Sequence, residues 1–365
     1  MAKQETAPDA VMIMATLLLL GIGVVMVYSA SAVLALHDFG DRFYYLKRQL
    51  LFAVLGVMAM YLAMNANYQL WKKFAKMGLI IAFVLLLLVI IPGVGVVRGG
   101  ARSWLGIASF GIQPSEFMKL AMIIFIAKML SAEQKKITSF TKGLLPVLLL
   151  LGSAFGLIML QPDLGTGVVL AGAVLLVAYA AGARVSHLLA LGGVGLVGLA
   201  GLVAVAPYRL QRITAFLDPW QDPLGAGYQA IQSLYAIGPG GLVGLGLGMS
   251  RQKYNYLPEP QTDFIFSIIA EELGFIGGAL VLLLFALLLW RGMRTAITAP
   301  DTFGSLLAVG IVSLIAVQVL INIGVVIGLF PVTGITLPLI SAGGSSLTLI
   351  LTAIGILLNI SRYAR

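Results

Sequence analysis

The chain of 365 residues lacks cysteine, has only 2 histidines, and is poor in charge, with 10% charged residues. Soluble domains carry about 25% charged residues, so this composition excludes that class of protein. Without cysteine the chain forms no disulfides and no thiolate metal sites. His37 and His187 are predicted on opposite sides of a membrane, which excludes a histidine metal cluster.

What the chain has instead is hydrophobicity, with 60% hydrophobic residues and a mean hydropathy of +1.04. Apolar runs long enough to cross roughly 30 Å of hydrocarbon as helices recur, and the alternation of a barrel is absent. We predict an all-α, polytopic membrane bundle of about ten helices, forming a single domain over residues 1–365. The predicted spans are 10–36, 48–66, 76–92, 114–130, 143–160, 165–182, 185–206, 264–290, 303–328 and 338–361.

The charges predict how this bundle is oriented. With ten spans both termini share a side, and more of the 23 lysines and arginines fall on that side, which predicts cytoplasmic termini. The first run is too long for a signal peptide and lacks its cleavage pattern, so we expect a retained helix. The outer face is still unusually basic, which suggests an anionic ligand there. The 43 glycines suggest close helix packing.

A large outer loop, approximately residues 207–262, separates the seventh and eighth spans. Apolar residues at helical spacing over 228–237, followed by glycines up to Gly248, predict an interfacial helix and then flexible or re-entrant backbone; an ordinary surface loop is the alternative. The loop leads to Asp263, the last polar residue before the eighth span. A carboxylate at a membrane edge is a functional candidate. Alternatively, Asp263 or Thr262 only caps the next helix.

Two groups of candidates lie near the fourth span. Glu116 and Lys119 are three residues apart, so they share a helix face and can pair, either as a structural ion pair or as a substrate contact. Arg98, Arg102 and Trp104 precede them as a cationic and aromatic cluster. Arginine suits bidentate phosphate binding, whereas tryptophan is also a common membrane-interface residue.

More carboxylates and cations follow along the chain. Asp163, in the tight turn 161–165, brings a second carboxylate to the outer face or only caps the next helix. Arg251 and Lys253 lie ten and twelve residues before Asp263. Glu271 and Glu272 lie about 12 Å deeper along the same helix, which suggests partners, a proton path or helix packing.

The last outer loop and the spans beside it carry uncharged polar residues. Ser345 and Ser346 follow two glycines, where the backbone could approach a ligand. Gln318 and Asn322 give the ninth span a polar face, although either could simply bridge helices.

Six of these segments together resemble a known family. They are Val27–Ser31, Gln113–Leu120, Gln161–Gly165, Tyr228–Leu234, Tyr256–Phe264 and Leu337–Ser346. In this order they are similar to the motifs of the SEDS family of shape, elongation, division and sporulation proteins, over nearly the whole chain. The stretch from Ser233 to Gly274 looks most like the FtsW and SpoVE branch, with RodA as the nearest alternative.

The resemblance implies a bacterial peptidoglycan glycosyltransferase that polymerises lipid II on the outer face of the cytoplasmic membrane. It implies a class B penicillin-binding protein transpeptidase and other divisome or elongasome membrane proteins as partners, and no nucleic acid. The family's catalytic aspartate falls on Asp263, its outer-loop arginine and tryptophan on Arg102 and Trp104, and its fourth-span acid and base on Glu116 and Lys119. Family members commonly have tyrosine where this chain has Ala342, which weakens any role for that position.

The expected chemistry is an inverting transfer, with Asp263 as general base and cations holding pyrophosphate. Arg102, Lys119, Arg251 and Lys253 are the candidates for that task. A divalent cation, Mg²⁺ or Mn²⁺, could share it, although no ligand set is legible. The predicted substrate-binding residues are Arg98, Arg102, Trp104, Glu116, Lys119, Asp163, Arg251, Lys253, Glu259, Ser345 and Ser346.

Two rival functions stay open. A lipid II flippase or other transporter would need polar groups accessible alternately from both sides, whereas the strongest cluster here is predicted near one face. A scaffold that only recruits the transpeptidase would tolerate Asp263→Asn without loss of glycan synthesis.

Overall fold

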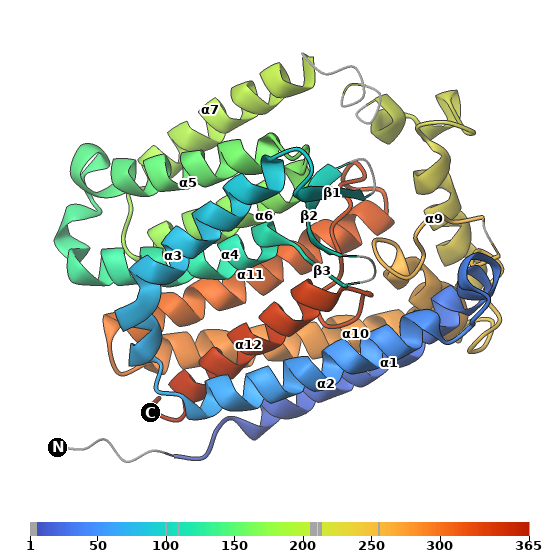
Figure 1. Ribbon diagram of the computed structural model, residues 1–365, viewed down its shortest axis with the longest axis horizontal. Helices are drawn as coiled ribbons and strands as arrows, with labels where there is room; N and C mark the ends of the chain where they lie inside the picture. The colour runs from blue at the N-terminus through green and yellow to red at the C-terminus, as the bar shows by residue number, and fades with distance from the viewer. Residues whose placement is uncertain are drawn as a thin grey trace.

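A computed structural model describes residues 6–98, 101–107, 110–204, 210, 214–254 and 256–364. Long helices run side by side in a bundle (Figure 1). The helices are α1 (Ala10–Phe39), α2 (Tyr44–Asn65), α3 (Gln69–Ile90), α4 (Pro114–Ala132), α5 (Leu145–Met159), α6 (Leu164–Ala180), α7 (Val185–Ala204), α9 (Tyr228–Gly240), α10 (Ile265–Thr298), α11 (Thr302–Val326) and α12 (Gly344–Ser361). The strands are β1 (Gly95–Arg98), β2 (Ala101–Ile107) and β3 (Phe110–Ile112).

A helix lies at each of the ten predicted spans, which confirms a multi-pass helical membrane protein. Seven helices in the described part of the chain are long and apolar enough to cross a membrane: α1, α2, α3, α5 with the π-helical turn before it, α10, α11 and α12. The α4 helix carries three charged side chains, and α6 has 17 residues. Aspartate side chains cap three of the helices: Asp9 accepts from Met12 N, Asp163 from Thr166 N and Asp301 from Gly304 N.

Glycines let the helices approach closely, as the glycine count suggested. A Cβ on Gly56 of α2 would lie 2.4 Å from a methyl carbon of Leu351 on α12, and one on Gly355 of α12 would lie 2.4 Å from the carbonyl oxygen of Met60. A side chain at Gly355 would push these helices apart because it meets backbone, whereas one at Gly56 would displace the Leu351 side chain. Small residues therefore make the contact between α2 and α12, as is usual where lipid offers no hydrophobic drive for helix association.

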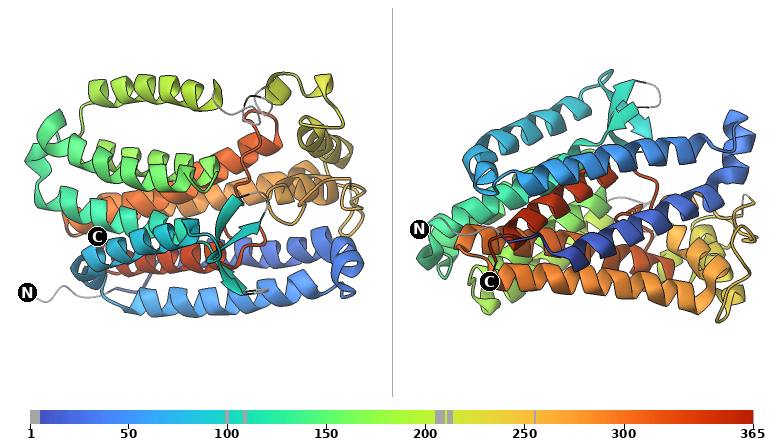
Figure 2. Two further views of the ribbon diagram at one scale, coloured as in Figure 1. Left: turned by 45° about the horizontal axis from the view of Figure 1, so that its top comes forward. Right: turned by 90° about the horizontal axis from the view of Figure 1, so that it is seen from below.

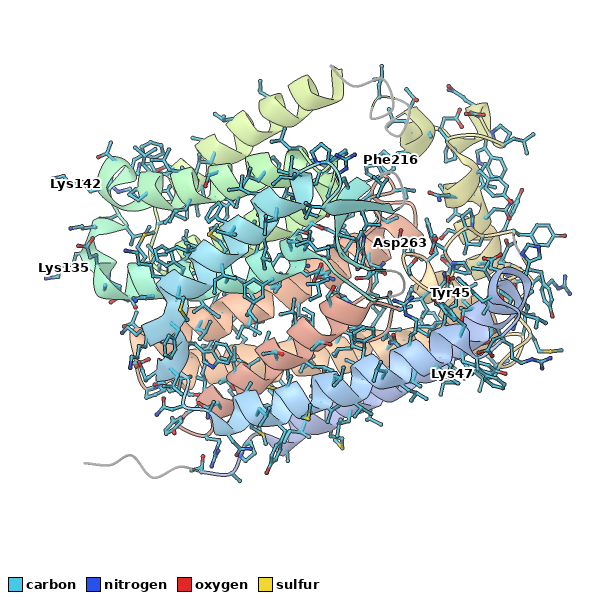
Figure 3. All side chains as sticks on the ribbon, in the orientation of Figure 1. Tyr45, Lys47, Lys135, Lys142, Phe216 and Asp263 are labelled. Carbon is cyan, nitrogen blue, oxygen red and sulfur yellow. The ribbon has the colours of Figure 1, made fainter. Side chains whose placement is uncertain are left out.

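The two ends of the bundle differ. Figures 1 and 2 show the start of α1 and the end of α12 at one end, which we call the terminal face, and the small sheet toward the other, which we call the sheet face. The two ends of the described chain meet there, where the Thr6 N–H donates to the Arg362 carbonyl at 2.9 Å. Side chains of Asp263 and Tyr45 lie at the sheet face, whereas Lys135 and Lys142 lie at the terminal face (Figure 3). The termini thus share a side, as predicted. That the terminal face is cytoplasmic stays a prediction.

Two features of the sheet face differ from the expectation. Strands β1, β2 and β3 form an antiparallel sheet, with Trp104 opposite Val96 and Leu105 opposite Ile112. The last span was predicted to begin at residue 338, but α12 begins at Gly344. The preceding residues form a turn in which Ser341 Oγ accepts from the Leu337 N–H at 2.8 Å.

The α10 helix is broken at Gly274, where φ is 67° and ψ is −164°. The break frees backbone groups that lipid cannot satisfy, and the loop after α9 supplies their partners. The bonds are Leu245 N to Glu271 O (2.9 Å), Gly246 N to Glu272 O (3.0 Å), Phe275 N to Gly241 O (2.9 Å) and Ile276 N to Leu242 O (3.1 Å). A Cβ on Gly274 would lie 2.3 Å from Gly244 N, so both the φ angle and the contact require glycine. The predicted helix over 228–237 is confirmed as part of α9.

Candidate active site

A cavity of about 620 Å³ lies at the sheet face, between α2, β2, α4, α6, α9, α11 and the loops before α10 and α12. These segments are far apart in the sequence, and the fold brings their polar ends together. The predicted site residues that line the cavity are Trp104, Glu116, Lys119, Asp163, Glu259, Asp263 and Ser346.

A buried ion pair forms part of the cavity wall. Lys119 Nζ lies 2.7 Å from Glu116 Oε1, and the two side chains are 3% and 7% exposed. The same ammonium donates to Gln318 Oε1 at 3.1 Å, and Gln318 Nε2 donates to the carbonyl of Thr336 at 3.1 Å. The predicted pairing of Glu116 with Lys119 is therefore confirmed, and α11 orients the ammonium from the opposite side.

Asp163 both caps the next helix and faces the cavity, the two roles predicted for its turn. Its Oδ1 caps α6 by accepting from Thr166 N at 3.1 Å, while Oδ2 accepts from Gln113 Nε2 at 3.2 Å and the residue faces the cavity. Burial raises the pKa of Asp163, and the nearby Glu116 charge acts in the same direction, although the bond from Thr166 N opposes them. Asp163 therefore holds a proton more readily than a solvated aspartate.

Asp263 lies at the cavity because other segments hold its backbone there. The N-cap position of α10 falls on Phe264, one residue after Asp263, and the Phe264 side chain makes no capping bond. Asn322 Nδ2 donates both to the Asp263 carbonyl at 2.8 Å and to the Ile335 carbonyl at 2.7 Å. A Cβ on Gly334 would lie 3.6 Å from Asp263 Oδ2, which places the carboxylate beside the loop before α12.

The residues just before Asp263 are fixed by the turn that precedes α12. Ser341 Oγ donates to the Thr262 carbonyl at 2.6 Å, and Ala342 N donates to the Gln261 carbonyl at 2.8 Å. Gln49 Nε2 of α2 in turn donates to the Ser341 carbonyl at 3.3 Å. These bonds preorganise the backbone that presents Asp263. Ala342 takes part through its N–H, which residues other than proline also supply.

Glu259 lies at the cavity in a left-handed backbone conformation, with a φ of 50°. Its Oε2 accepts from Gln261 Nε2 at 3.1 Å and from Thr262 Oγ1 at 3.3 Å. A residue other than glycine in this region costs on the order of 1 kcal/mol or more, and such strain concentrates at functional sites. The side chain is exposed, so it is accessible to a ligand.

Some predicted substrate contacts lie outside the cavity wall. Arg102 lies on β2, two residues before Trp104, but does not line the cavity, and the side chain of Arg98 lies outside the described part of the structure. Ser345 Oγ accepts from the Gln113 N–H at 3.3 Å and so joins α12 to the start of α4. Ser345 thus supports the cavity wall through Gln113, which lines it.

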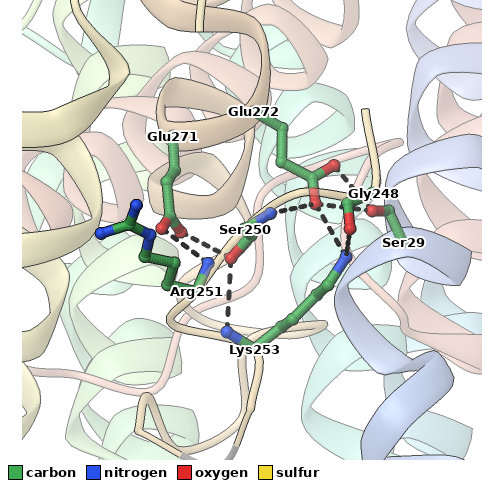
Figure 4. Close-up of polar contacts among 7 residues, drawn as sticks. All are labelled: Ser29, Gly248, Ser250, Arg251, Lys253, Glu271 and Glu272. Atoms are coloured by element: carbon green, nitrogen blue, oxygen red, sulfur yellow. Dashed lines mark hydrogen bonds and ion pairs between the residues drawn. The ribbon is translucent and has the colours of Figure 1, made fainter. Parts of the chain in front are cut away.

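Arg251 and Lys253 also lie outside the cavity, in a separate buried network (Figure 4). Lys253 Nζ donates to the Gly248 carbonyl at 2.5 Å and pairs with Glu272 Oε1 at 3.1 Å. The Arg251 N–H donates to Glu271 Oε1 at 2.8 Å, and the Arg251 side chain is exposed. Neither cation lines the cavity, so the structure does not bring them together with the other site candidates, and their role in holding pyrophosphate stays a prediction.

Among the residues of the cavity wall that sequence reasoning missed are Tyr45, Arg48 and Gln49 of α2. The second span was predicted to begin at residue 48, which put Arg48 at the very edge of that span. In the structure α2 begins at Tyr44, so Arg48 lies one turn inside a membrane helix, where its guanidinium donates to the Tyr44 hydroxyl at 3.2 Å. A cation inside such a helix is itself a functional signal.

The cavity wall carries charged groups of both signs. Four carboxylates line it, those of Glu116, Asp163, Glu259 and Asp263, together with the Lys119 ammonium and a guanidinium. Within the described ranges, no three acidic or histidine side chains gather as a metal site.

The fold and cavity define a multi-pass helical membrane protein with a charged, partly buried site at one face. The family model described as "Cell cycle protein", which joins FtsW, RodA and SpoVE, matches residues 9–365, and the chain belongs to this family. The resemblance to SEDS proteins is thereby confirmed.

Two relatives show how similar the chain is to named proteins. Stage V sporulation protein E of Bacillus subtilis (strain 168) is 62% identical over 365 residues, covering 100% of both chains. A protein named "Probable peptidoglycan glycosyltransferase FtsW", of Geobacter sp. (strain M18), is 45% identical over 357 residues, covering 98% of this chain and 97% of its own length.

Solved structures share the fold. The crystal structure of the Thermus thermophilus rod shape determining protein RodA aligns with a TM-score of 0.73 and 30% identity, over 98% of this chain and 97% of that one. A chain from a structure described as "Structural coordination of polymerization and crosslinking by a peptidoglycan synthase complex" aligns with a TM-score of 0.79 and 33% identity, over 98% of each chain.

Proposed function

We propose that this chain polymerises lipid II into glycan strands on the outer face of the bacterial cytoplasmic membrane, with its sheet face outward. Relatives that match nearly its full length are named as probable peptidoglycan glycosyltransferases. The observation that carries the proposal is a cavity that places the Asp263 carboxylate together with the Lys119 ammonium and the Arg48 guanidinium.

The chemistry needs one base and a site for a leaving anion. Asp263 accepts the proton of the acceptor sugar's 4-hydroxyl while the oxygen of that hydroxyl bonds to the anomeric carbon of the growing chain. The bond from that carbon to the lipid pyrophosphate breaks, and the α linkage becomes β by inversion. Pyrophosphate leaves as a stable anion, so no second carboxyl is required to protonate it, in contrast to an inverting glycosidase.

Cations stabilise the pyrophosphate as its charge develops. We assign this task to Lys119 and Arg48, which line the cavity, in place of Arg251 and Lys253. A Mg²⁺ or Mn²⁺ ion carried by the pyrophosphate would add to their charge. Polymerisation before and after chelation by EDTA measures that contribution.

The partner follows from the solved relatives. A chain with this fold occurs in a structure described as a peptidoglycan synthase complex that coordinates polymerization and crosslinking. We infer that a class B penicillin-binding protein transpeptidase binds this chain and crosslinks the strands it makes.

The position of the charged groups favours a polymerase over a transporter. The ionisable residues of the cavity wall come from the sheet-face ends of α2 and α4 and from the loops before α6 and α10. A carrier would need such groups to be accessible alternately from both faces. Gathering the charge at one face suits a reaction performed there.

The test is glycan-strand formation from purified lipid II by wild type and Asp263→Asn, each with and without the cognate transpeptidase. Asn322 and the turn before α12 hold this segment through its backbone, so the variant should fold and bind its partner. Polymer from wild type alone supports Asp263 as the base. Equal polymer from both removes that role, and lipid II translocation in vesicles without polymer would favour the transporter.

A further inference from the structure

The chain between Ser250 and Glu272 is a closed loop that carries Asp263. Four contacts close its base: Ser250 N to Glu272 Oε1 (3.1 Å), Ser250 Oγ to Glu271 Oε2 (2.5 Å), Arg251 N to Glu271 Oε1 (2.8 Å) and Lys253 Nζ to Glu272 Oε1 (3.1 Å) (Figure 4). Both carboxylates come from α10, whose first residues follow Asp263 directly. Closing a loop at its base removes most of the positions its middle could otherwise take.

The closure is tied to a second membrane helix. Ser29 Oγ of α1 lies 2.8 and 2.6 Å from the two carboxylate oxygens of Glu272. Figure 4 shows the Glu272 carboxylate in contact with both the Ser29 hydroxyl and the ammonium of Lys253. The base of the loop is therefore fixed to α1 and α10 together, whereas its tip near Asp263 is fixed to α11 and the turn before α12.

Burial makes this closure strong. Glu271 is 1% exposed, Glu272 is 0% exposed and Lys253 is 5% exposed. A buried charge that loses its partner is costly, so each member of such a network holds the others in place. The exposed ion pair of Lys136 with Glu133 has no such hold, because water replaces either partner.

We propose that Glu272, acting with Lys253 and Ser29, is a positioning residue that sets where Asp263 stands in the cavity. The proposal rests on the proposed function and assigns no substrate contact to Glu272, which does not line the cavity. A displacement of about 1 Å at reacting groups can lower a rate by on the order of 10²-fold. Loosening the base of the loop therefore lowers the rate of transfer while leaving the substrate-binding wall intact.

The test compares Glu272→Gln with a matched change at the other end of the same two helices. Asp9, just before α1, pairs with Arg291 of α10 at the terminal face, so Asp9→Asn removes an ion pair between the same elements far from the cavity. We expect Glu272→Gln to lower kcat for lipid II polymerisation by about tenfold or more, with KM within about threefold of wild type. We expect Asp9→Asn, at a similar loss of melting temperature, to keep kcat within about twofold.

A double variant separates positioning from stability. Glu272→Gln with Lys253→Gln removes the buried unpaired ammonium, so the melting temperature recovers, while kcat stays low because the charged closure is gone. A kcat that recovers in step with the melting temperature would overturn the proposal. So would an unchanged kcat in Glu272→Gln, or an equal loss in Asp9→Asn.

Hydrogen exchange gives a readout that needs no activity. The backbone amides of the five non-proline residues within 256–262 should exchange faster in Glu272→Gln than in wild type and should be unchanged in Asp9→Asn. Unchanged exchange in Glu272→Gln refutes the closure even if no variant polymerises. Lack of polymer from the wild type would instead count against the proposed function, so the two failures are distinguishable.

Discussion

The buried pair of Glu116 with Lys119 allows the sharpest test of the cavity, because it is either a structural ion pair or part of the site. Its side chains are 7% and 3% exposed and its atoms are 2.7 Å apart. Breaking a buried pair by removing one partner costs about 3–5 kcal/mol, whereas replacing both with neutral residues is often neutral or stabilising. Glu116 lies in the first turn of α4, where the helix dipole stabilises a carboxylate. The loss of stability in Lys119→Met alone should therefore lie at or below the lower end of that range.

Glu116→Gln leaves the ammonium without its carboxylate and should cost more, although Gln318 still accepts from Lys119. The double variant Glu116→Gln with Lys119→Met should recover most of the lost stability. The assays are unfolding of the purified proteins in detergent and polymerisation of lipid II. We expect the double variant to stay inactive, because Lys119 stabilises the pyrophosphate.

A matched control lies on the terminal face. Lys136 pairs with Glu133 at the same three-residue spacing and the same 2.7 Å, but the side chains are 52% and 55% exposed. Glu133→Gln should cost about 0.5 kcal/mol or less and leave polymerisation unchanged. Polymerisation that recovers with stability in the double variant would show that the buried pair is only structural, and the role of Lys119 would be refuted.

Three further predictions use other parts of the fold. Asn322→Ala should lower kcat for polymerisation, because it frees the Asp263 carbonyl. The control is Asn359→Ala, which removes an equally buried amide that binds two backbone groups near the terminal face. It should lower the melting temperature by a similar amount without lowering kcat. Gly274→Ala should lower the melting temperature strongly, because its φ is 67° and a Cβ there would meet backbone. Burial, as the largest cause, raises the pKa of Tyr68 from 10.0 to about 12, so the folded state keeps this phenol proton longer than the unfolded state. The contribution of this proton to the free energy of unfolding is fully present below pH 10 and should be lost between pH 10 and pH 12. In unfolding scans across this range, Tyr68→Phe should abolish the part of the loss that Tyr68 causes.

The sequence predicts the spans and the place of Asp263 for the same physical reason. Long apolar runs can only be helices in lipid, and a carboxylate directly before such a run lies at its end whatever the rest of the chain does. The pairing of Glu116 with Lys119 was also predictable, because three residues along a helix bring two side chains to one face. These are local relations that a helix guarantees.

Relations across a loop are not guaranteed in this way. Arg251 and Lys253 are close to Asp263 in sequence, but the loop folds back toward α10. There the Arg251 N–H binds Glu271 and the Lys253 ammonium binds Glu272. The partners were recognisable as unusual deep carboxylates. Their pairing with this loop depends on the break in α10, which no periodicity reveals. The depth of Arg48 was missed for a simpler reason, since Tyr44, Tyr45 and Lys47 make the first turn of α2 polar and aromatic and hide it from a search for apolar runs.

The break in α10 and the closure of the loop that carries Asp263 are one structure. At Gly274 the helix loses backbone bonds, and in lipid those groups must find partners within the protein. The segment after α9 provides them by running against the break, and the glycines at 240 and 244 let it approach, since a Cβ at either would lie within 2.2 Å of an α10 carbonyl oxygen. The same approach carries Ser250 and Lys253 to the carboxylates of the residues just before the break. A straight α10 would leave this loop without its backbone partners, so the irregular helix fixes the base of the loop, while Asn322 and the turn before α12 fix the segment that carries Asp263.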